Sequence, residues 1–188
     1  LWRREWIEQH RVTHAPQLLR IVVGIDPAVT STAASDETGI VVGGVAMVGD
    51  DLHAFILDDV SMKASPDAWA NQAVAVYHKY QADRIIAEVN NGGDLVEHTI
   101  RTVDPHVPVS AVRASRGKAV RAEPVTALYE QGRVHHVGAF RGLEDQMCGW
   151  TPLSAESPDR VDALVWCVTD LLIDNPPVSA PVRLQVKW

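Results

Sequence analysis

Three segments near the start of the chain have the apolar pattern of β-strands. Residues 18–26 (LLRIVVGID) are apolar at neighbouring positions, which is typical of a strand buried on both faces of a sheet. Residues 39–48 and 52–62 are also rich in strand-forming residues, and the turn residues 49–51 (GDD) separate them. We therefore expect three antiparallel strands at the start of the domain.

Helical and strand-like segments alternate after this hairpin. A helix begins at Ser65-Pro66-Asp67, with Ser at the N-cap and Pro at the first helical position. The pattern then predicts strands at 83–89, 107–113 and 133–137 and helices at 93–103, 118–131, 140–150 and 157–173. The expected fold class is α/β: a mixed sheet of antiparallel hairpin strands followed by parallel strands, with helices on both faces.

The two ends of the chain differ from this pattern. Residues 1–17 have helical spacing, with Trp2 and Trp6 on one face. Nothing within the domain is expected to cover these tryptophans, so we interpret residues 1–17 as a linker helix from an upstream domain. Residues 175–188 form a proline-rich tail that we expect to be extended. Residues 18–174 remain as one globular domain.

Composition narrows the class of protein. The chain has 188 residues, of which 46% are hydrophobic, enough for one domain with its own core. Cys148 and Cys167 have no partner at ligand spacing and indicate reduced core residues. Since there is neither a signal peptide nor a long apolar run, we expect a soluble intracellular protein with no membrane partner. The net charge of −7 argues against a surface that coats nucleic acid, but not against a local basic groove.

Two carboxylates stand where buried strands end. Asp26 closes the first apolar run and Glu88 closes another, and a buried charge is costly unless a partner or a metal compensates it. If the two strands are parallel neighbours, both acids project from the same edge of the sheet. Asp162 borders the buried stripe of the last helix. Asp159 lies on the same side of that helix, although an acid in a first turn also complements the helix dipole.

Carboxylates from distant segments that meet at one edge form an all-oxygen site suited to Mg²⁺ or Mn²⁺. Two such ions about 3.5–4 Å apart can activate a water and stabilise the leaving oxygen of a phosphodiester. The acids therefore predict a two-metal phosphodiester hydrolase. The alternative is that they are unrelated surface acids or members of ion pairs.

Three motifs carry a resemblance to a known family. They are GIDPA (24–28), IIAEVNNGG (85–93) and SPDRVDALVWC (157–167), and the Lys- and Arg-bearing segment 113–138 and the tryptophan-bearing first helix accompany them. Together they resemble the RNase H-like nuclease domain of the large subunit of tailed-phage terminases. The resemblance covers most of the chain.

This resemblance implies a metal-dependent endodeoxyribonuclease that cuts concatemeric double-stranded viral DNA during packaging, with little sequence preference, in the cytoplasm of the host cell. It implies metal ligands at Asp26, Glu88 and Asp162, with Asp159 at a position that varies in the family, and two Mg²⁺ or Mn²⁺ ions. The implied partners are an upstream packaging ATPase domain of the same polypeptide, the portal and the small terminase subunit. The chain has no G-x-x-x-x-G-K-[ST] motif, so we expect cleavage without ATP-driven translocation.

One short basic segment is the best candidate for DNA contact. Arg113, Arg116, Lys118 and Arg121 lie in a stretch without an acidic residue. On an acidic protein they indicate a phosphate-contacting surface, with Lys118 nearest the scissile phosphate. The alternative is a solvated loop followed by a helix start.

Other functions remain open at this point. Holliday-junction resolvases and transposases use the same fold and acids. The opening GID followed by a Thr-rich loop is also similar to sugar kinases and actin-like ATPases, although these need two such domains. A catalytically inactive DNA-binding or docking module is a further alternative.

Overall fold

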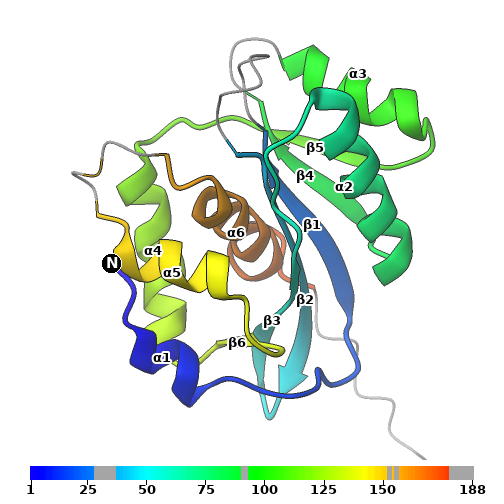
Figure 1. Ribbon diagram of the computed structural model, residues 1–188. Helices are drawn as coiled ribbons and strands as arrows, with labels where there is room; N and C mark the ends of the chain where they lie inside the picture. Colours follow the sequence, from blue (N-terminus) through cyan, green and yellow to red (C-terminus); the bar gives the residue numbers. More distant parts are fainter. Residues whose placement is uncertain (28–36, 90–92, 152–153, 155–156, 178–188) are drawn as a thin grey trace, which may run out of the picture.

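The computed structural model describes residues 1–27, 37–89, 93–151, 154 and 157–177, which form a six-stranded sheet between two layers of helices (Figure 1). The strand order is β5-β4-β1-β2-β3-β6. The strand bounds are β1 Arg20–Asp26, β2 Gly39–Val48, β3 Asp51–Asp59, β4 Arg84–Glu88, β5 Val109–Val112 and β6 Val134–His136. Residues 178–188 of the predicted tail lie outside the described part of the chain.

The strand pairing is that of the predicted mixed sheet. β2 is antiparallel to β1 and to β3, whereas β4 is parallel to β1 and β5, and β6 is parallel to β3. Ile25 of β1 is in register with Ala87 of β4. Because these two strands are parallel neighbours, Asp26 and Glu88, which follow those residues, end at the same edge of the sheet.

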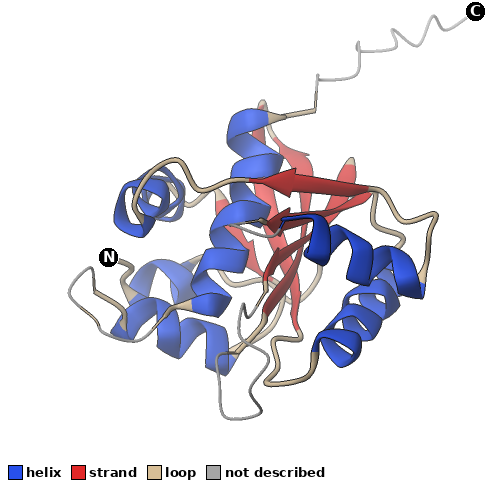
Figure 2. Ribbon diagram, turned by 90° about the horizontal axis from the view of Figure 1, so that it is seen from above, coloured by secondary structure: helices blue, strands red, loops and turns tan. Residues whose placement is uncertain are grey.

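Helices cover both faces of the sheet (Figure 2). One face carries α2 (Pro66–Tyr80) and α3 (Gly93–Val103), and the other carries α1 (Arg4–Gln9), α4 (Lys118–Glu130), α5 (Arg141–Gly149), α6 (Asp159–Thr169) and the π-helical turn η1 (Asp170–Asp174). Val22 packs in the core under α6 and Val23 in the core under α2, which explains why this strand is apolar at neighbouring positions. Cys148 and Cys167 are free thiols; Cys167 is buried in the core, as predicted, whereas Cys148 is only partly buried against it.

Two glycines let α6 lie directly on the sheet. A Cβ atom on Gly24 would stand 2.4 Å from the carbonyl oxygen of Ala163, and one on Gly39 would stand 2.0 Å from that of Asp159. Such distances are far below van der Waals contact, so any larger residue would push the helix away. These glycines therefore set how closely Asp162 approaches the end of β1.

The starts of α2 and α6 show whether a serine before a Pro-Asp pair caps the helix that follows. The Ser65 hydroxyl accepts a backbone N–H in the first turn of α2, as expected. Ser157 precedes the same Pro-Asp pair as Ser65, which predicts an N-cap there too, but this prediction is wrong: α6 has Pro158 at its N-cap, with no side-chain cap. The Ser157 hydroxyl instead accepts a hydrogen bond of 2.8 Å from Lys118 Nζ. The last helix also ends in a π-helical turn rather than continuing as an α-helix.

The first helix belongs to the core of this domain. Trp2 is 4% exposed, and its ring meets the Tyr129 ring edge-on, with the centroids 6.4 Å apart. Ile7 is buried in the same cluster. The expectation that nothing in the domain covers the tryptophan face is therefore wrong for Trp2. Trp6 is only partly buried and lies under the guanidinium of Arg3.

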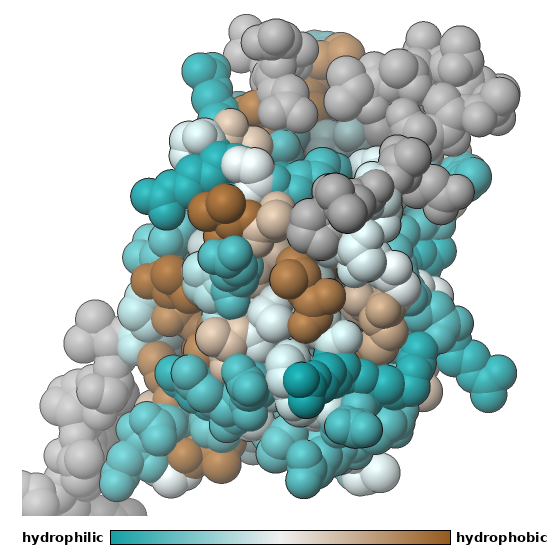
Figure 3. Space-filling view, turned by 90° about the vertical axis from the view of Figure 1, so that its left-hand side faces the viewer, coloured by the Kyte–Doolittle hydropathy of each residue, from teal (hydrophilic) through white to brown (hydrophobic). Residues whose placement is uncertain are grey.

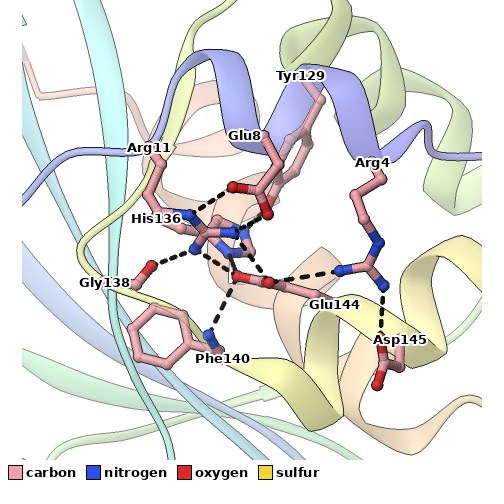
Figure 4. Close-up of polar contacts among 9 residues, drawn as sticks. All are labelled: Arg4, Glu8, Arg11, Tyr129, His136, Gly138, Phe140, Glu144 and Asp145. Carbon is pink, nitrogen blue, oxygen red and sulfur yellow. Dashed lines mark hydrogen bonds and ion pairs between the residues drawn. The ribbon is translucent and has the colours of Figure 1, made fainter.

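A buried polar cluster fastens α1 to the domain (Figure 4). Glu144 accepts hydrogen bonds of 2.7 and 3.0 Å from Arg11, and its Oε1 lies 2.9 Å from His136 Nδ1. The Tyr129 hydroxyl is 2.8 Å from His136 Nε2. Burial alone would raise the pKa of Glu144, but the hydrogen bonds from His136 and Arg11 hold that pKa well below its usual range. Through the ionised buried carboxylate of Glu144, the cluster thus links the segment that follows α1 to β6, α4 and α5.

Figure 3 shows the side of the molecule on which α1, α4 and α5 lie. Apolar side chains form small separate groups among polar ones on this side. This agrees with the inward orientation of Trp2 and Ile7. No helix in the described ranges is long and apolar enough to cross a bilayer.

Candidate active site

The predicted carboxylates meet at one edge of the sheet. Asp26 ends β1 and Glu88 ends the neighbouring β4, and α6 carries Asp162 over them from its first turn. Glu88 is 5% exposed and Asp162 is 3% exposed, while Asp26 is half-buried. Segments that are far apart in sequence therefore bring three acids into one largely buried cluster.

The negative charges of these carboxylates raise one another's pKa values. Burial, followed by the negative charges of Asp162 and Glu88, raises the pKa of Asp26 to about 8, although Lys118 opposes the shift. Burial also raises the pKa of Asp162, against the hydrogen bond and charge of Lys118. Three acids held together in this way carry a repulsion that a cation relieves.

Two side chains of α4 neutralise part of this charge. Lys118 Nζ lies 2.5 Å from Asp162 Oδ2. The guanidinium of Arg121 donates to Glu88 Oε2 at 3.0 Å and to Asp162 Oδ1 at 3.3 Å. The two cations differ in exposure: 41% of the Lys118 side chain is exposed, but only 9% of the Arg121 side chain is.

Trp166 is a member of the site that the sequence analysis missed. Its indole Nε1 donates a hydrogen bond of 2.6 Å to Glu88 Oε2, and the Arg121 guanidinium lies 4.7 Å from the centre of its ring. Trp166 stands four residues after Asp162, on the same side of α6. That helical spacing is the signal that could have revealed it.

Asp159 lies beside the cluster. It is 8% exposed at the start of α6, and its charge contributes to the raised pKa of Asp26. The next residue, Arg160, forms ion pairs of 2.6 Å with Glu37 and with Asp59. These pairs anchor the start of α6 to the chain around β2 and β3.

The four predicted DNA-contacting residues fall into two pairs. Arg113 and Arg116 are exposed on the segment between β5 and α4. Lys118 and Arg121 instead point into the acid cluster. The assignment of Arg121 to a phosphate-contacting surface stays a prediction, and its ion pairs with two buried carboxylates do not favour it.

The donor set of the cluster fits a hard divalent cation. All three acids supply carboxylate oxygens, the ligands that Mg²⁺ and Mn²⁺ prefer. Within the ranges that the structure describes, no group of three or more His, Cys, Asp or Glu is arranged as a ready metal cage. Lys118 and Arg121 form ion pairs with the carboxylate oxygens that such a cage would need. For a metal ion to bind these oxygens, at least one of the two side chains has to move.

The fold and this site define an RNase H-like nuclease domain. The family model described as the terminase RNase H-like domain matches residues 23–170, so the chain belongs to that family. This assignment favours the terminase over the resolvase, transposase and actin-like alternatives. No curated protein matches the chain.

Solved structures of low sequence identity share the fold. The nuclease domain of the large terminase subunit of bacterial virus Sf6 is 14% identical with a TM-score of 0.65, and the match covers 89% of this chain and 97% of that one. The large terminase nuclease of thermophilic phage G20c with bound magnesium is 12% identical with a TM-score of 0.62, and the match covers 84% of each chain. The large terminase of another thermophilic bacteriophage is 8% identical with a TM-score of 0.62, and the match covers 85% of this chain but 42% of that one.

Proposed function

We propose that this domain hydrolyses phosphodiester bonds of double-stranded DNA with divalent metal ions held by Asp26, Glu88 and Asp162. The observation that carries the proposal is the convergence of half-buried Asp26 with buried Glu88 and Asp162 at one sheet edge in a member of the terminase family. Buried carboxylates are costly without a compensating cation, so a protein keeps three of them together where a cation is needed.

We assign two ions, Mg²⁺ or Mn²⁺, to this site. The related G20c nuclease was solved with magnesium and a variant of the Sf6 nuclease domain with manganese, which supports this choice. When bound, such a pair activates a water and stabilises the leaving oxygen. Asp26 and Glu88 are held by rigid strand ends and Asp162 by α6, so the ligands need little rearrangement. Asp159 is the candidate for an additional ligand.

The basic residues would bind the DNA backbone. Arg113 and Arg116 are exposed on the segment that leads to the acid cluster, and Lys118 is the more exposed cation within it. Phosphate contacts of this kind place the duplex without reading its sequence. We therefore expect weak, sequence-independent binding that falls with salt.

The family suggests the biological setting. We propose that the domain cuts concatemeric viral DNA during packaging, in the host cytoplasm, next to an ATPase domain of the same polypeptide and with the portal and small terminase subunit as further partners. Because most of an acidic surface repels phosphate, tethering to a motor that holds the duplex would raise the local DNA concentration.

Cleavage of plasmid DNA tests the proposal. The chain should nick and linearise plasmid with Mn²⁺ or Mg²⁺, and a chelator should abolish cleavage. Asp26→Asn, Glu88→Gln and Asp162→Asn should each remove activity while circular dichroism shows a retained fold, and Asp159→Asn should be milder. Asp50→Asn, in the exposed turn between β2 and β3, is the matched control and should cut normally. Full activity in any of the three ligand variants would overturn the site.

Two further measurements test the substrate. Arg113→Ala and Arg116→Ala should each reduce the slope of log affinity against log salt by about one, equally for unrelated sequences, and Lys118→Ala should weaken binding in the same uniform way. A panel of linear duplex and four-way junctions separates the terminase from the resolvase alternative. Strong preference for the junction would contradict the proposal.

A further inference from the structure

Arg121 links two of the acidic side chains of the site, Glu88 and Asp162. Its two terminal nitrogens bond to Glu88 and to Asp162, which come from β4 and α6. No single strand or helix holds both of these carboxylates, so their separation depends on a side chain that reaches both. A planar guanidinium fork can do this, whereas an ammonium is a point charge.

Trp166 contacts both Glu88 and Arg121. Its N–H shares the same Glu88 oxygen with Arg121, and its ring lies against the guanidinium. Glu88 Oε2 is thus held by two donors. Among the described residues, both hydrogen bonds to this carboxylate go to Oε2 and none goes to Oε1.

The contrast with Lys118 separates two roles within the cluster. Lys118 is exposed enough to swing away from Asp162 on its flexible stem. Arg121 is enclosed, stacked and bonded at both ends. A side chain in this position contributes little to a DNA-facing surface, and its loss would act through the carboxylates that it holds.

We propose that Arg121, supported by Trp166, is a positioning residue that holds Glu88 and Asp162 in the arrangement needed for metal binding, rather than a residue that contacts DNA phosphate. This inference rests on the proposed function of the same site. Residues that orient metal ligands typically change metal affinity or activity by about 10–100-fold when they are replaced.

Two substitutions that preserve charge test the inference. Arg121→Lys keeps the positive charge but removes the fork, and Trp166→Phe removes only the indole donor. Both should weaken Mn²⁺ binding, measured by calorimetry without DNA, by about 10–100-fold. Both should also shift the Mn²⁺ dependence of plasmid cleavage to higher concentration. In Arg121→Met, which removes the charge, the salt slope of DNA binding should remain that of the wild type.

Arg84→Lys is the matched control. Arg84 pairs with buried Asp170 at 2.6 Å, at the opposite end of β4 from Glu88. Its replacement should lower the melting temperature in a similar way but leave Mn²⁺ affinity unchanged. The comparison separates the positioning of ligands from general loss of stability, and Trp166→Phe provides a second test if Arg121→Lys folds poorly.

Two outcomes would overturn the inference. One is wild-type Mn²⁺ affinity in both Arg121→Lys and Trp166→Phe. The other is a salt slope that falls by about one unit in Arg121→Met, which removes the charge, while Arg121→Lys keeps wild-type metal binding; this would assign Arg121 to a phosphate. Normal cleavage by Asp26→Asn, Glu88→Gln or Asp162→Asn would instead overturn the proposed function, so the two failures are distinguishable.

Discussion

Lys118 Nζ lies 2.5 Å from Asp162 Oδ2. The lysine ammonium is thus paired with a carboxylate that the proposed function assigns to a metal ion. The positive charge of the lysine compensates the buried acid in the metal-free protein. The same charge competes with any incoming cation.

Replacement of Lys118 by Met should therefore strengthen Mn²⁺ binding to the DNA-free protein, by about tenfold, because it removes a positive charge from the site. The melting temperature in chelator should fall, since Asp162 loses a partner. Calorimetry and thermal melts measure the two effects. Lys63→Met, at an exposed position, is the control and should change neither. Unchanged Mn²⁺ affinity in Lys118→Met would argue that the lysine does not compete.

The raised pKa of Asp26 predicts a pH dependence of stability. Because this pKa is about 8 in the folded protein, against 3.8 for an ordinary aspartate, the folded state binds more protons between these values. Stability in chelator should therefore fall as pH rises through this window and level off above it. Asp26→Asn should lack this component, so its melting temperature should exceed that of the wild type at pH 9 more than at pH 5. Parallel pH profiles for the two proteins would refute the assignment.

The burial of Trp2 predicts that the first helix is needed for stability. Trp2→Ala should lower the free energy of unfolding by about 3–5 kcal/mol, as is usual for a large buried aromatic side chain. Trp6→Ala should cost much less, because Trp6 is only partly buried. Deletion of residues 1–12 should destabilise the domain strongly, since it also removes Arg11 from Glu144. Chemical denaturation measures all three. Equal small losses for both tryptophans would restore the interpretation of an undocked linker.

The contact of Gly39 with α6 predicts that a single methyl group disturbs the site. Gly39→Ala would place a Cβ atom against the Asp159 carbonyl, so α6 must shift and carry Asp162 with it. We expect the free energy of unfolding to fall by about 1–3 kcal/mol and cleavage to be lost. Gly117→Ala is the control, because a Cβ there meets nothing within 4 Å. A wild-type melting temperature and wild-type cleavage in Gly39→Ala would show that α6 tolerates the shift.

Local pattern was sufficient for the elements of the sheet. The run at 18–26 is apolar at neighbouring positions because Val22 and Val23 enter different cores. The Ser65 cap was predictable because it depends on residues within one turn. Ser157 has the same local signature, yet its hydroxyl binds Lys118 from another helix. A contact between distant segments therefore overrode the capping preference.

The order of residues already indicates which acids end buried strands, since Asp26 and Glu88 each close an apolar run, and it places Asp162 at the border of a buried helical stripe. It also indicates a short basic segment, 113–121, that leads into α4. The inward turn of Arg121 to Glu88 and Asp162, the exposure of Arg113 and the packing of Trp2 on Tyr129 depend instead on the folded arrangement. The cause is that local pattern records only whether a side chain is compatible with burial or solvent. The partner that it meets depends on how strands and helices far apart in the chain are packed together.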